Sequence, residues 1–285
     1  EIILLENIRY FKEESNDDEN FSKKLGSLGD IYINDAFSCS HRKQASIHNI
    51  TKFIKHSYAG PLLKKEIEAI NFIIQNKKKP VTCIIGGSKI STKINVISSL
   101  IEKVNNLIIV GAMANNFFVY KNLKVGKSLV EENTKEIIKD IYEKAKKSMC
   151  EIIIPEDCIV GKSLNGDGER KSLNAVKDNE IILDIGPITV QNIKNKINQS
   201  NTVLWNGPAG YFENENFMAG TMFIADAISK NTRDKSLISI LGGGDTLAAI
   251  NKSKNKLSFT HLSTAGGAFL EYLEGKDLPG LSVLK

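Results

Sequence analysis

The sequence predicts an α/β protein in which a doubly wound domain with a parallel sheet follows an incomplete second α/β domain. Three observations predict this class. Continuously apolar runs alternate with amphipathic runs from residue 81 to residue 269, and Gly-bearing turns follow the apolar runs. The 285 residues, 41% of them hydrophobic and 25% charged, can bury a sizeable core. Strands buried on both faces are continuously apolar, and strands that alternate with helices form parallel sheets.

These runs define the elements expected in the larger domain. Apolar residues predict strands at 81–85, 107–110, 152–154, 181–183, 202–205 and 237–241. Apolar residues at three- and four-residue spacing predict helices at 92–104, 134–147 and 215–230. Asn133, with Glu136 three residues later, predicts a cap at the start of the second helix. The polar segment 163–179 is expected to be a surface loop or a short hairpin.

The first 60 residues are expected to be the remainder of another α/β domain. Apolar runs predict strands at 2–10 and 30–37, a helix at 19–28 between them, and a long helix at 60–75. A helix must stop before Pro80, which follows three lysines, so a domain boundary is expected there. We therefore predict an N-terminal domain at 1–60, an interdomain helix at 61–79, a C-terminal domain at 80–264, and a segment at 265–285 that packs back on the N-terminal domain.

The start of the chain predicts that further residues precede it. The chain opens inside an apolar run and without Met. Two or three strands are too few to close a sheet. On grounds of domain size, we expect a preceding segment of roughly a hundred residues.

Composition limits the classes of partner. Lys and Arg number 38 against 33 for Asp and Glu, and the surplus of +5 is spread along the chain. A diffuse surplus suits phosphorylated ligands and argues against nucleic acid, which requires a clustered basic face. The apolar runs are far shorter than the ~18 residues of a membrane span. The four cysteines form no C-x-x-C pair and the four histidines show no metal spacing, so we expect free thiols in a cytoplasmic protein and no zinc site.

Four Gly-bearing turns follow predicted strands, and together they indicate a phosphorylated ligand. Ligands of open α/β sheets bind at the carboxyl ends of the strands, where glycine lets backbone N–H groups approach a phosphate. A single Gly pair is more often a cap or tight turn, but four turns at matching positions favour a binding site. The sequence lacks the P-loop and dinucleotide fingerprints. The turns are Gly86-Gly87-Ser88-Lys89, Gly111-Ala112-Met113, Gly242-Gly243-Gly244-Asp245-Thr246 and Ser263-Thr264-Ala265-Gly266-Gly267.

Charged residues in these turns supply what phosphoryl transfer requires, namely cations for the phosphoryl oxygens and a carboxylate for Mg²⁺. Their i, i+4 spacing predicts that Lys89 and Lys93 share one helical face, although such a pair is more often solvated. Asp245 is either a helix N-cap or a metal ligand.

Three other charged residues are candidates for ligand contacts. Glu213 follows a Gly- and Pro-rich loop and is placed to reach a ligand hydroxyl. Arg9 and Arg42 lie at or after predicted strands, where guanidinium groups can clamp an anion bidentately. The alternative for both arginines is an ordinary exposed side chain.

Seven blocks occur in a fixed order: Leu4-Leu5-Glu6-Asn7-Ile8-Arg9, Asn34-Asp35-Ala36-Phe37, His41-Arg42, Gly86-Gly87-Ser88-Lys89 with Lys93, Trp205-Asn206-Gly207-Pro208, Gly242 to Thr246, and Leu273-Glu274-Gly275-Lys276. In this order they resemble the phosphoglycerate kinase family along the whole chain. The resemblance implies a two-lobed, monomeric kinase of glycolysis and gluconeogenesis. Such enzymes move a phosphoryl group reversibly between 1,3-bisphosphoglycerate and ADP, giving 3-phosphoglycerate and ATP, by hinge closure.

The resemblance also implies residue roles. Lys89, Gly266 and Gly267 would act on the transferred phosphoryl group, while Arg9 and Arg42 would hold 3-phosphoglycerate. The C-terminal lobe would bind Mg-ADP or Mg-ATP, with Asp245 on the metal. The implied nucleotide-binding residues are Lys93, Gly186, Asn206, Glu213, Gly243, Gly244, Asp245 and Thr246. The implied partners are these small molecules, with no nucleic acid and no membrane.

Departures from the family pattern leave alternatives open. Ala112 and Ala265 stand where family members have glycine, which predicts at most a weaker fit to ligands, and residues 38–40 differ from the usual Gly-Thr-Ala. The family's Asp-Phe-Asn and His-Leu-Gly-Arg motifs are not in this sequence, so this chain alone is expected to bind nucleotide without turnover. One alternative is a catalytically silent nucleotide-binding remnant. Another is a polyanion-binding protein with Lys-rich stretches, which is disfavoured because aromatic residues are not interleaved.

Overall fold

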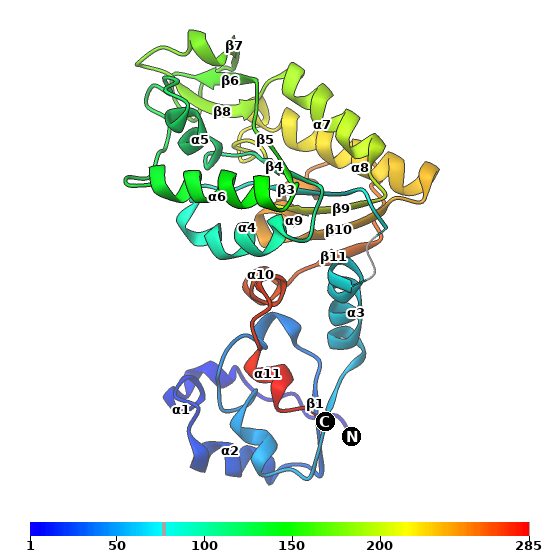
Figure 1. Ribbon diagram of the computed structural model, residues 1–285. Helices are drawn as coiled ribbons and strands as arrows, with labels where there is room; N and C mark the ends of the chain where they lie inside the picture. Colours follow the sequence, from blue (N-terminus) through cyan, green and yellow to red (C-terminus); the bar gives the residue numbers. More distant parts are fainter. Residues whose placement is uncertain (76–77, 285) are drawn as a thin grey trace. The chain divides into compact units, whose positions relative to one another are not determined.

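The computed structural model describes residues 1–75 and 78–284. The chain divides into two compact units (Figure 1). Unit 1 comprises Glu1–Asn71 and Ala265–Lys285, and unit 2 comprises Phe72–Thr264.

A six-stranded parallel sheet forms the centre of unit 2, in the order β11-β10-β9-β3-β4-β5. Every residue of β3 and β9 is buried, as a continuously apolar run predicts for strands covered on both faces. The strands are β3 (Val81–Ile85), β4 (Asn106–Ile109), β5 (Glu151–Ile153), β9 (Thr202–Asn206), β10 (Ile238–Gly242) and β11 (His261–Ser263).

Helices cover both faces of this sheet: α4 and α6 lie on one face, and α7 and α8 lie on the other (Figure 1). The core on the α7 and α8 side includes Ile84, Trp205 and Ile228, all fully buried. The predicted α/β fold with a parallel sheet is therefore confirmed. The helices are η4 (Ser91–Lys93), α4 (Ile94–Ile101), α5 (Ala114–Tyr120), α6 (Lys135–Lys147), α7 (Pro187–Gln199), η6 (Glu215–Phe217), α8 (Ala219–Lys235) and α9 (Gly244–Ile250).

A separate antiparallel sheet, in the order β7-β6-β8, corrects the predicted topology. The strand expected at 181–183 does not join the parallel sheet, because β8 (Ile181–Ile185) pairs antiparallel with β6 (Asp157–Gly161). A continuous apolar run indicates burial but does not choose the partner strand. Segment 163–179 contains one strand, β7 (Glu169–Ser172), which pairs antiparallel with β6 outside the segment, and η5 (Leu173–Ala175), so the segment supplies one strand of a hairpin.

The cap predicted for α6 is wrong. The N-cap residue of α6 is Thr134, without a side-chain capping bond, and Asn133 adopts a left-handed backbone with a φ of 58°. The capping pattern therefore did not locate the cap, because the helix begins one residue later than the pattern predicts.

Unit 1 has one small sheet, in which β1 and β2 are parallel. Strand β1 ends at Asn34, and the Asp35 carboxylate caps the next long helix by accepting from Leu62 N (2.6 Å) and Leu63 N (2.9 Å). The elements are η1 (Ile8–Tyr10), α1 (Lys12–Ser15), α2 (Glu19–Gly26), β1 (Ile31–Asn34), η2 (Phe37–Cys39), η3 (Asn49–Lys52), β2 (His56–Ala59), α10 (Gly266–Glu274) and α11 (Pro279–Ser282), while α3 (Pro61–Gln75) begins in unit 1 and ends in unit 2.

The strand predicted at residues 2–10 is wrong. Residues 1–7 form neither helix nor strand, and the next three residues form η1, where the Asn7 side chain accepts from Arg9 N (3.1 Å). Ile2 and Leu4 are 98% and 96% exposed. A strand requires a neighbouring strand for its backbone hydrogen bonds, and none of the described strands pairs with this segment.

The cysteines agree with the expectation of free, buried thiols. The four thiols are free, and Cys83, Cys150 and Cys158 are buried. Within residues 1–75 and 78–284, no helix combines the length and the hydrophobicity needed to cross a bilayer.

Candidate active site

Three side chains join the carboxyl ends of β3, β9 and β10. Lys93 Nζ donates to the Gly86 carbonyl (2.7 Å) and to Asn206 Oδ1 (2.7 Å). Asn206 Nδ2 and Thr246 Oγ1 both donate to the Gly242 carbonyl, at 2.8 Å and 3.0 Å. Three of the predicted nucleotide-site residues therefore meet at the sheet edge where ligands of open α/β folds bind.

Lys93 is a cation turned into the protein. Desolvation by burial lowers the pKa of Lys93 to about 8, although Cys83 and Asp245 act in the opposite direction. Because this ammonium group is poorly solvated inside the protein, it would interact favourably with an anionic ligand close to Nζ.

Lys89 and Lys93 do not share a helical face, contrary to the prediction. Lys89 lies before η4 begins at Ser91, so no helix imposes the i, i+4 geometry on the pair. Lys89 is exposed, whereas Lys93 bonds inward to the end of β3. The two lysines consequently lie in different environments, and only Lys89 points its charge into solvent.

Three turns of the site pack backbone against backbone. Gly207 has a φ of +98°, and a Cβ there would lie 2.3 Å from the Gly86 carbonyl oxygen. Gly111 has a φ of +69°, and a Cβ there would lie 2.7 Å from Gly87 N. Only glycine meets both requirements, so the turns after β3, β4 and β9 touch directly and present backbone at the site.

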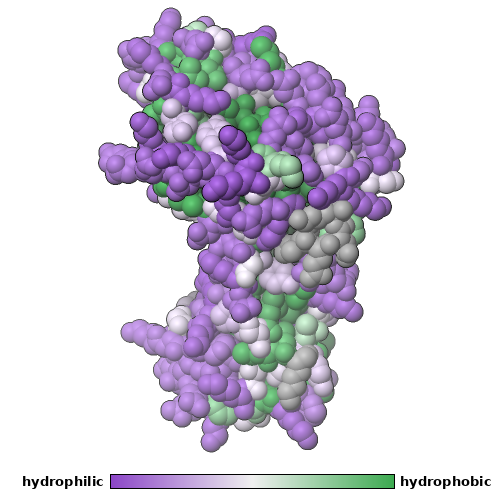
Figure 2. Space-filling view, viewed as in Figure 1, coloured by the Kyte–Doolittle hydropathy of each residue, from purple (hydrophilic) through white to green (hydrophobic). Residues whose placement is uncertain are grey.

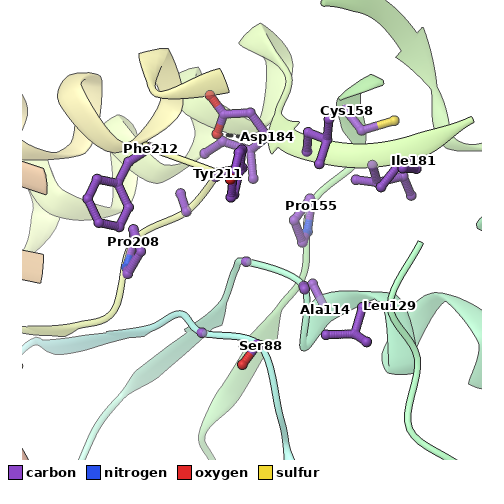
Figure 3. A pocket seen from close by; sticks show the side chains of 18 of the residues that line it. Ser88, Ala114, Leu129, Pro155, Cys158, Ile181, Asp184, Pro208, Tyr211 and Phe212 are labelled. Atoms are coloured by element: carbon purple, nitrogen blue, oxygen red, sulfur yellow. Dashed lines mark hydrogen bonds between the residues drawn. The ribbon is translucent and has the colours of Figure 1, made fainter. Parts of the chain in front are cut away.

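A cavity of about 380 Å³ opens beside these turns (Figure 3). Ser88, from the turn after β3, lies across the cavity from Pro208 and Tyr211, from the loop after β9. Glu213 and Asp245 add exposed carboxylates to the lining. A mostly apolar pocket with a few polar groups suits a small organic ligand. Apolar lining residues include Ala114, Phe118, Leu129, Pro155, Ile181 and Phe212.

Asp184, at the end of β8, is a cavity residue that the sequence analysis missed. Its side chain is buried, and its carboxylate accepts from Gly220 N (2.7 Å) and Ile185 N (2.9 Å). Burial raises the pKa of Asp184 to about 7, against the effect of these two bonds. One sequence signal could have identified Asp184. It is a carboxylate near the end of a predicted strand, two residues before Gly186, and Pro187 then starts α7.

The start of α9 excludes one of the two alternatives for Asp245. The N-cap of α9 is Gly243, so the N-cap alternative is wrong, and Asp245 is an exposed carboxylate beside the cavity. Around Gly244 there is open space, with nothing within 4 Å of a Cβ placed there. Gly186 is different: it is the N-cap of α7, and a Cβ there would lie 2.3 Å from the Asp157 carboxyl carbon. Gly186 therefore allows close packing against Asp157 and is not among the residues that line the cavity, and its contact with the nucleotide stays a prediction.

In unit 1, the two predicted arginines flank η2. Arg9 Nη2 lies 3.9 Å from Cys39 Sγ, and Arg42 N donates to the Cys39 carbonyl (2.9 Å). Both arginine side chains are exposed. The fold therefore brings near each other two guanidinium-bearing segments that lie about thirty residues apart in the chain.

The other predicted residues of unit 1 begin α10. Gly266 is its first residue and faces open space, whereas a Cβ at Gly267 would lie 3.1 Å from His41 Nε2. His41 Nδ1 is buried and has no hydrogen-bond partner among the described residues. The first N–H groups of α10 and the His41 ring thus lie together, with no side chain between them.

The fold and the site define the class of protein. Glycine-bearing turns, two lysines and a carboxylate at the carboxyl edge of a parallel sheet are the parts of a phosphoryl-transfer site. The sequence model of the family described as phosphoglycerate kinase matches residues 1–276. The chain belongs to the phosphoglycerate kinase family.

Individual relatives agree with this assignment. The phosphoglycerate kinase of Wolbachia pipientis subsp. Culex pipiens is 47% identical over 285 residues, which cover 99% of this chain and 71% of that protein. The structure of phosphoglycerate kinase from Coxiella burnetii has a TM-score of 0.89 at 39% identity, over 97% of this chain and 71% of that one. The enzyme from Pyrococcus horikoshii has a TM-score of 0.81 at 28% identity, over 98% and 71% of the two chains.

Proposed function

We propose the residue roles by which this member of the phosphoglycerate kinase family performs its reaction. The reaction follows from the family: the chain is a transferase that moves a phosphoryl group reversibly between 1,3-bisphosphoglycerate and ADP, giving 3-phosphoglycerate and ATP in glycolysis. The relatives give no support to the alternative of a silent remnant. The observation that carries the assignment of roles is the bonded group of Lys93, Asn206 and Thr246 beside the cavity.

In unit 2 the nucleotide would lie with its base in the cavity and its phosphates at the sheet edge. The apolar lining supports the base, and the exposed Glu213 supports a contact to the ribose hydroxyls. Lys93 would exchange its backbone and amide partners for phosphate oxygens, with Asn206 and Thr246 beside it. Gly244 leaves room for a phosphate at the start of α9, and Gly243, whose φ of +101° suits glycine, would offer it a backbone N–H group. Gly186 acts indirectly, by allowing β8 and α7 to approach Asp157.

We assign Mg²⁺ to Asp245. In the part of the chain that the structure describes, no group of three or more His, Cys, Asp or Glu side chains could hold a metal ion. Magnesium fits this arrangement because it binds through one or two carboxylates together with substrate phosphates and water. When bound, the ion would neutralise charge on the nucleotide phosphates.

Lys89 would stabilise charge on the phosphoryl group during transfer. It is exposed and follows Ser88, which lines the cavity, so its ammonium group is free to meet a ligand. In unit 1, Arg9 and Arg42 would hold the phosphate of 3-phosphoglycerate, and the N–H groups of Gly266 and Gly267 would bind the transferred group. We further propose a monomer that works in the cytoplasm, as the family resemblance implies.

The experiment that tests these roles is Lys89→Ala, made in a full-length version of the protein, with turnover measured in a coupled assay and ADP affinity measured by calorimetry. An interaction made only in the transition state lowers turnover without weakening binding. We expect turnover to fall about a hundredfold, or ~3 kcal/mol, with ADP affinity nearly unchanged.

Lys162→Ala is the matched control, because Lys162 is an exposed lysine directly after the Gly161 that ends β6. It should leave both quantities unchanged. Equal losses of turnover and affinity in Lys89→Ala would instead make Lys89 a nucleotide anchor.

A further inference from the structure

The turn that carries Lys89 starts a helix without a cap of its own. Lys89 is exposed, whereas the next residue, Ile90, is fully buried. Ile90 is the N-cap of η4 and Lys93 is the N-cap of α4, and neither side chain accepts a capping hydrogen bond. The first N–H groups of a helix have no partner within it. An acceptor for this turn must therefore come from elsewhere in the fold.

Glu131 is that acceptor, although it lies forty residues further along the chain. Its Oε2 accepts from Ile90 N and from Ser91 N (3.1 Å), and its Oε1 accepts from Ser91 Oγ. One carboxylate thus binds three donors of the two residues that follow Lys89. Hydrogen bonds to an ionised acceptor are about twice as strong as neutral ones.

Glu131 is also charged where it acts. Desolvation raises the pKa of its carboxyl, but the hydrogen bonds from Ser91 and Ile90, together with nearby Lys89, hold that pKa below its usual value. The carboxylate is therefore ionised throughout the neutral pH range.

Two buried asparagines fix the segment that carries Glu131. Asn116 Oδ1 accepts from Glu131 N (2.9 Å), and Asn115 Nδ2 donates to the Leu129 carbonyl (3.0 Å). Both asparagines are 1% exposed and belong to α5, and Leu129 lines the cavity. Glu131 consequently connects a rigid helix beside the cavity to the turn of Lys89.

We propose that Glu131 is a positioning residue for Lys89, which acts by anchoring the backbone of Ile90 and Ser91. This inference rests on the proposed role of Lys89 in phosphoryl transfer. Lys89 has a long, exposed side chain, so the position of its ammonium group depends on the backbone from which it starts. Among the described residues, Glu131 is the only side chain from another segment that anchors this backbone, and it does so directly after Lys89. Thr92 Oγ1 adds a local bond to the Lys89 carbonyl (2.9 Å).

The expected consequence is a loss of turnover without a loss of nucleotide affinity. A displacement of about 1 Å in a catalytic group can lower the rate about a hundredfold. Glu131→Ala removes the anchor, and we expect turnover to fall between about tenfold and a hundredfold, with ADP affinity within about twofold. Glu131→Gln keeps the shape and one acceptor, so its loss should be smaller.

The test compares turnover and calorimetric ADP affinity in Glu131→Ala, Glu131→Gln and the control Glu132→Ala, all made in a full-length version of the protein. Glu132 is the adjacent, exposed carboxylate and lies outside this network, so its removal changes the net charge equally and should leave turnover unchanged. Amide hydrogen exchange supplies a readout without turnover: the N–H groups of Ile90 and Ser91 should exchange faster in Glu131→Ala. The same amides should keep their wild-type rates in Glu132→Ala.

A double-mutant cycle separates positioning from general damage. If Glu131 acts through Lys89, Glu131→Ala should have no further effect on turnover in a Lys89→Ala background. Multiplied losses, equal losses of affinity, or unchanged turnover in Glu131→Ala would each overturn the inference. If Lys89→Ala itself retains turnover, the proposed role of Lys89 fails, and the inference fails with it. If Lys89→Ala lowers turnover and Glu131→Ala does not, the inference about Glu131 is overturned while the proposed role of Lys89 stands.

Discussion

Strands β1 of unit 1 and β3 of unit 2 are both apolar, but only one of them is buried. In β3 every residue is buried, whereas Ile31 and Ile33 of β1 are 58% and 59% exposed. Strand β3 has a parallel neighbour on each side and helices over both faces of its sheet, while β1 pairs with β2 alone. Figure 2 shows hydrophobic residues at the surface of unit 1 in the region of β1. Burial thus depends on the number of neighbours a strand acquires, and not on its hydrophobicity alone.

The two units also differ in how they present cations to an anionic ligand. Unit 1 offers exposed guanidinium groups, Arg9 and Arg42, around a short helix. Unit 2 holds Lys93 in fixed bonds at a sheet edge, where burial lowers its pKa to about 8. Lys93 is therefore held by the edge of its sheet, whereas the two guanidinium groups of unit 1 are exposed.

Matched truncations in the two strands test the comparison most strongly. Ile84→Ala in β3 empties a fully buried site and should lower the free energy of unfolding by about 2–5 kcal/mol. Ile33→Ala in β1 removes an exposed side chain and should change it by less than about 0.5 kcal/mol. Urea denaturation, followed by the fluorescence of the single tryptophan, Trp205, and by circular dichroism, measures both. Similar losses in the two variants would show that the outer face of β1 is covered in solution.

A second prediction concerns the buried carboxylate of unit 2. The folded protein keeps Asp184 protonated to about pH 7, whereas the unfolded chain releases that proton near 3.8. Between these values the folded state binds more protons, so the stability contributed by Asp184 falls as the pH rises, by about 4 kcal/mol in total. Asp184→Asn should remove this fall, as denaturation curves between pH 4 and pH 8 would show.

The control for that pH dependence lies in unit 1. Asp17 is a carboxylate with an imidazole partner, His48 Nδ1, at 2.8 Å. Asp17→Asn leaves Asp184 unchanged, so it should retain the fall in stability that Asp184 contributes between pH 4 and pH 7. If the stability of Asp184→Asn still falls as the pH rises, other groups cause the fall.

The smallest expected effect separates the ligands of the two units. Asp245→Asn should weaken Mg-ADP about tenfold, or ~1.4 kcal/mol, and leave metal-free ADP nearly unchanged, because the carboxylate acts through the metal. Arg42→Ala, in unit 1, should leave the affinities for Mg-ADP and metal-free ADP unchanged and weaken the binding of 3-phosphoglycerate. Calorimetric titrations with and without Mg²⁺ measure these affinities. Equal weakening of both forms of ADP by Asp245→Asn would argue against the metal role.

Local sequence patterns determined most elements of unit 2. Continuous apolar runs located β3 and β9, and the Gly-bearing turns located the edge at which Lys93, Asn206 and Thr246 meet. Both signals are local, because burial on two faces and a left-handed turn each restrict the residue types at that position.

Tertiary structure decided which strands pair and where side chains point. The apolar run of β8 pairs with β6 outside the parallel sheet, and the apolar residues 2–5 pair with no described strand. Lys93 turns inward to the Gly86 carbonyl, and Glu131 reaches a turn forty residues earlier in the chain. Periodicity and spacing describe a segment's own burial and backbone. Partners distant in the chain are chosen only when the segments pack, since their hydrogen bonds form at that step.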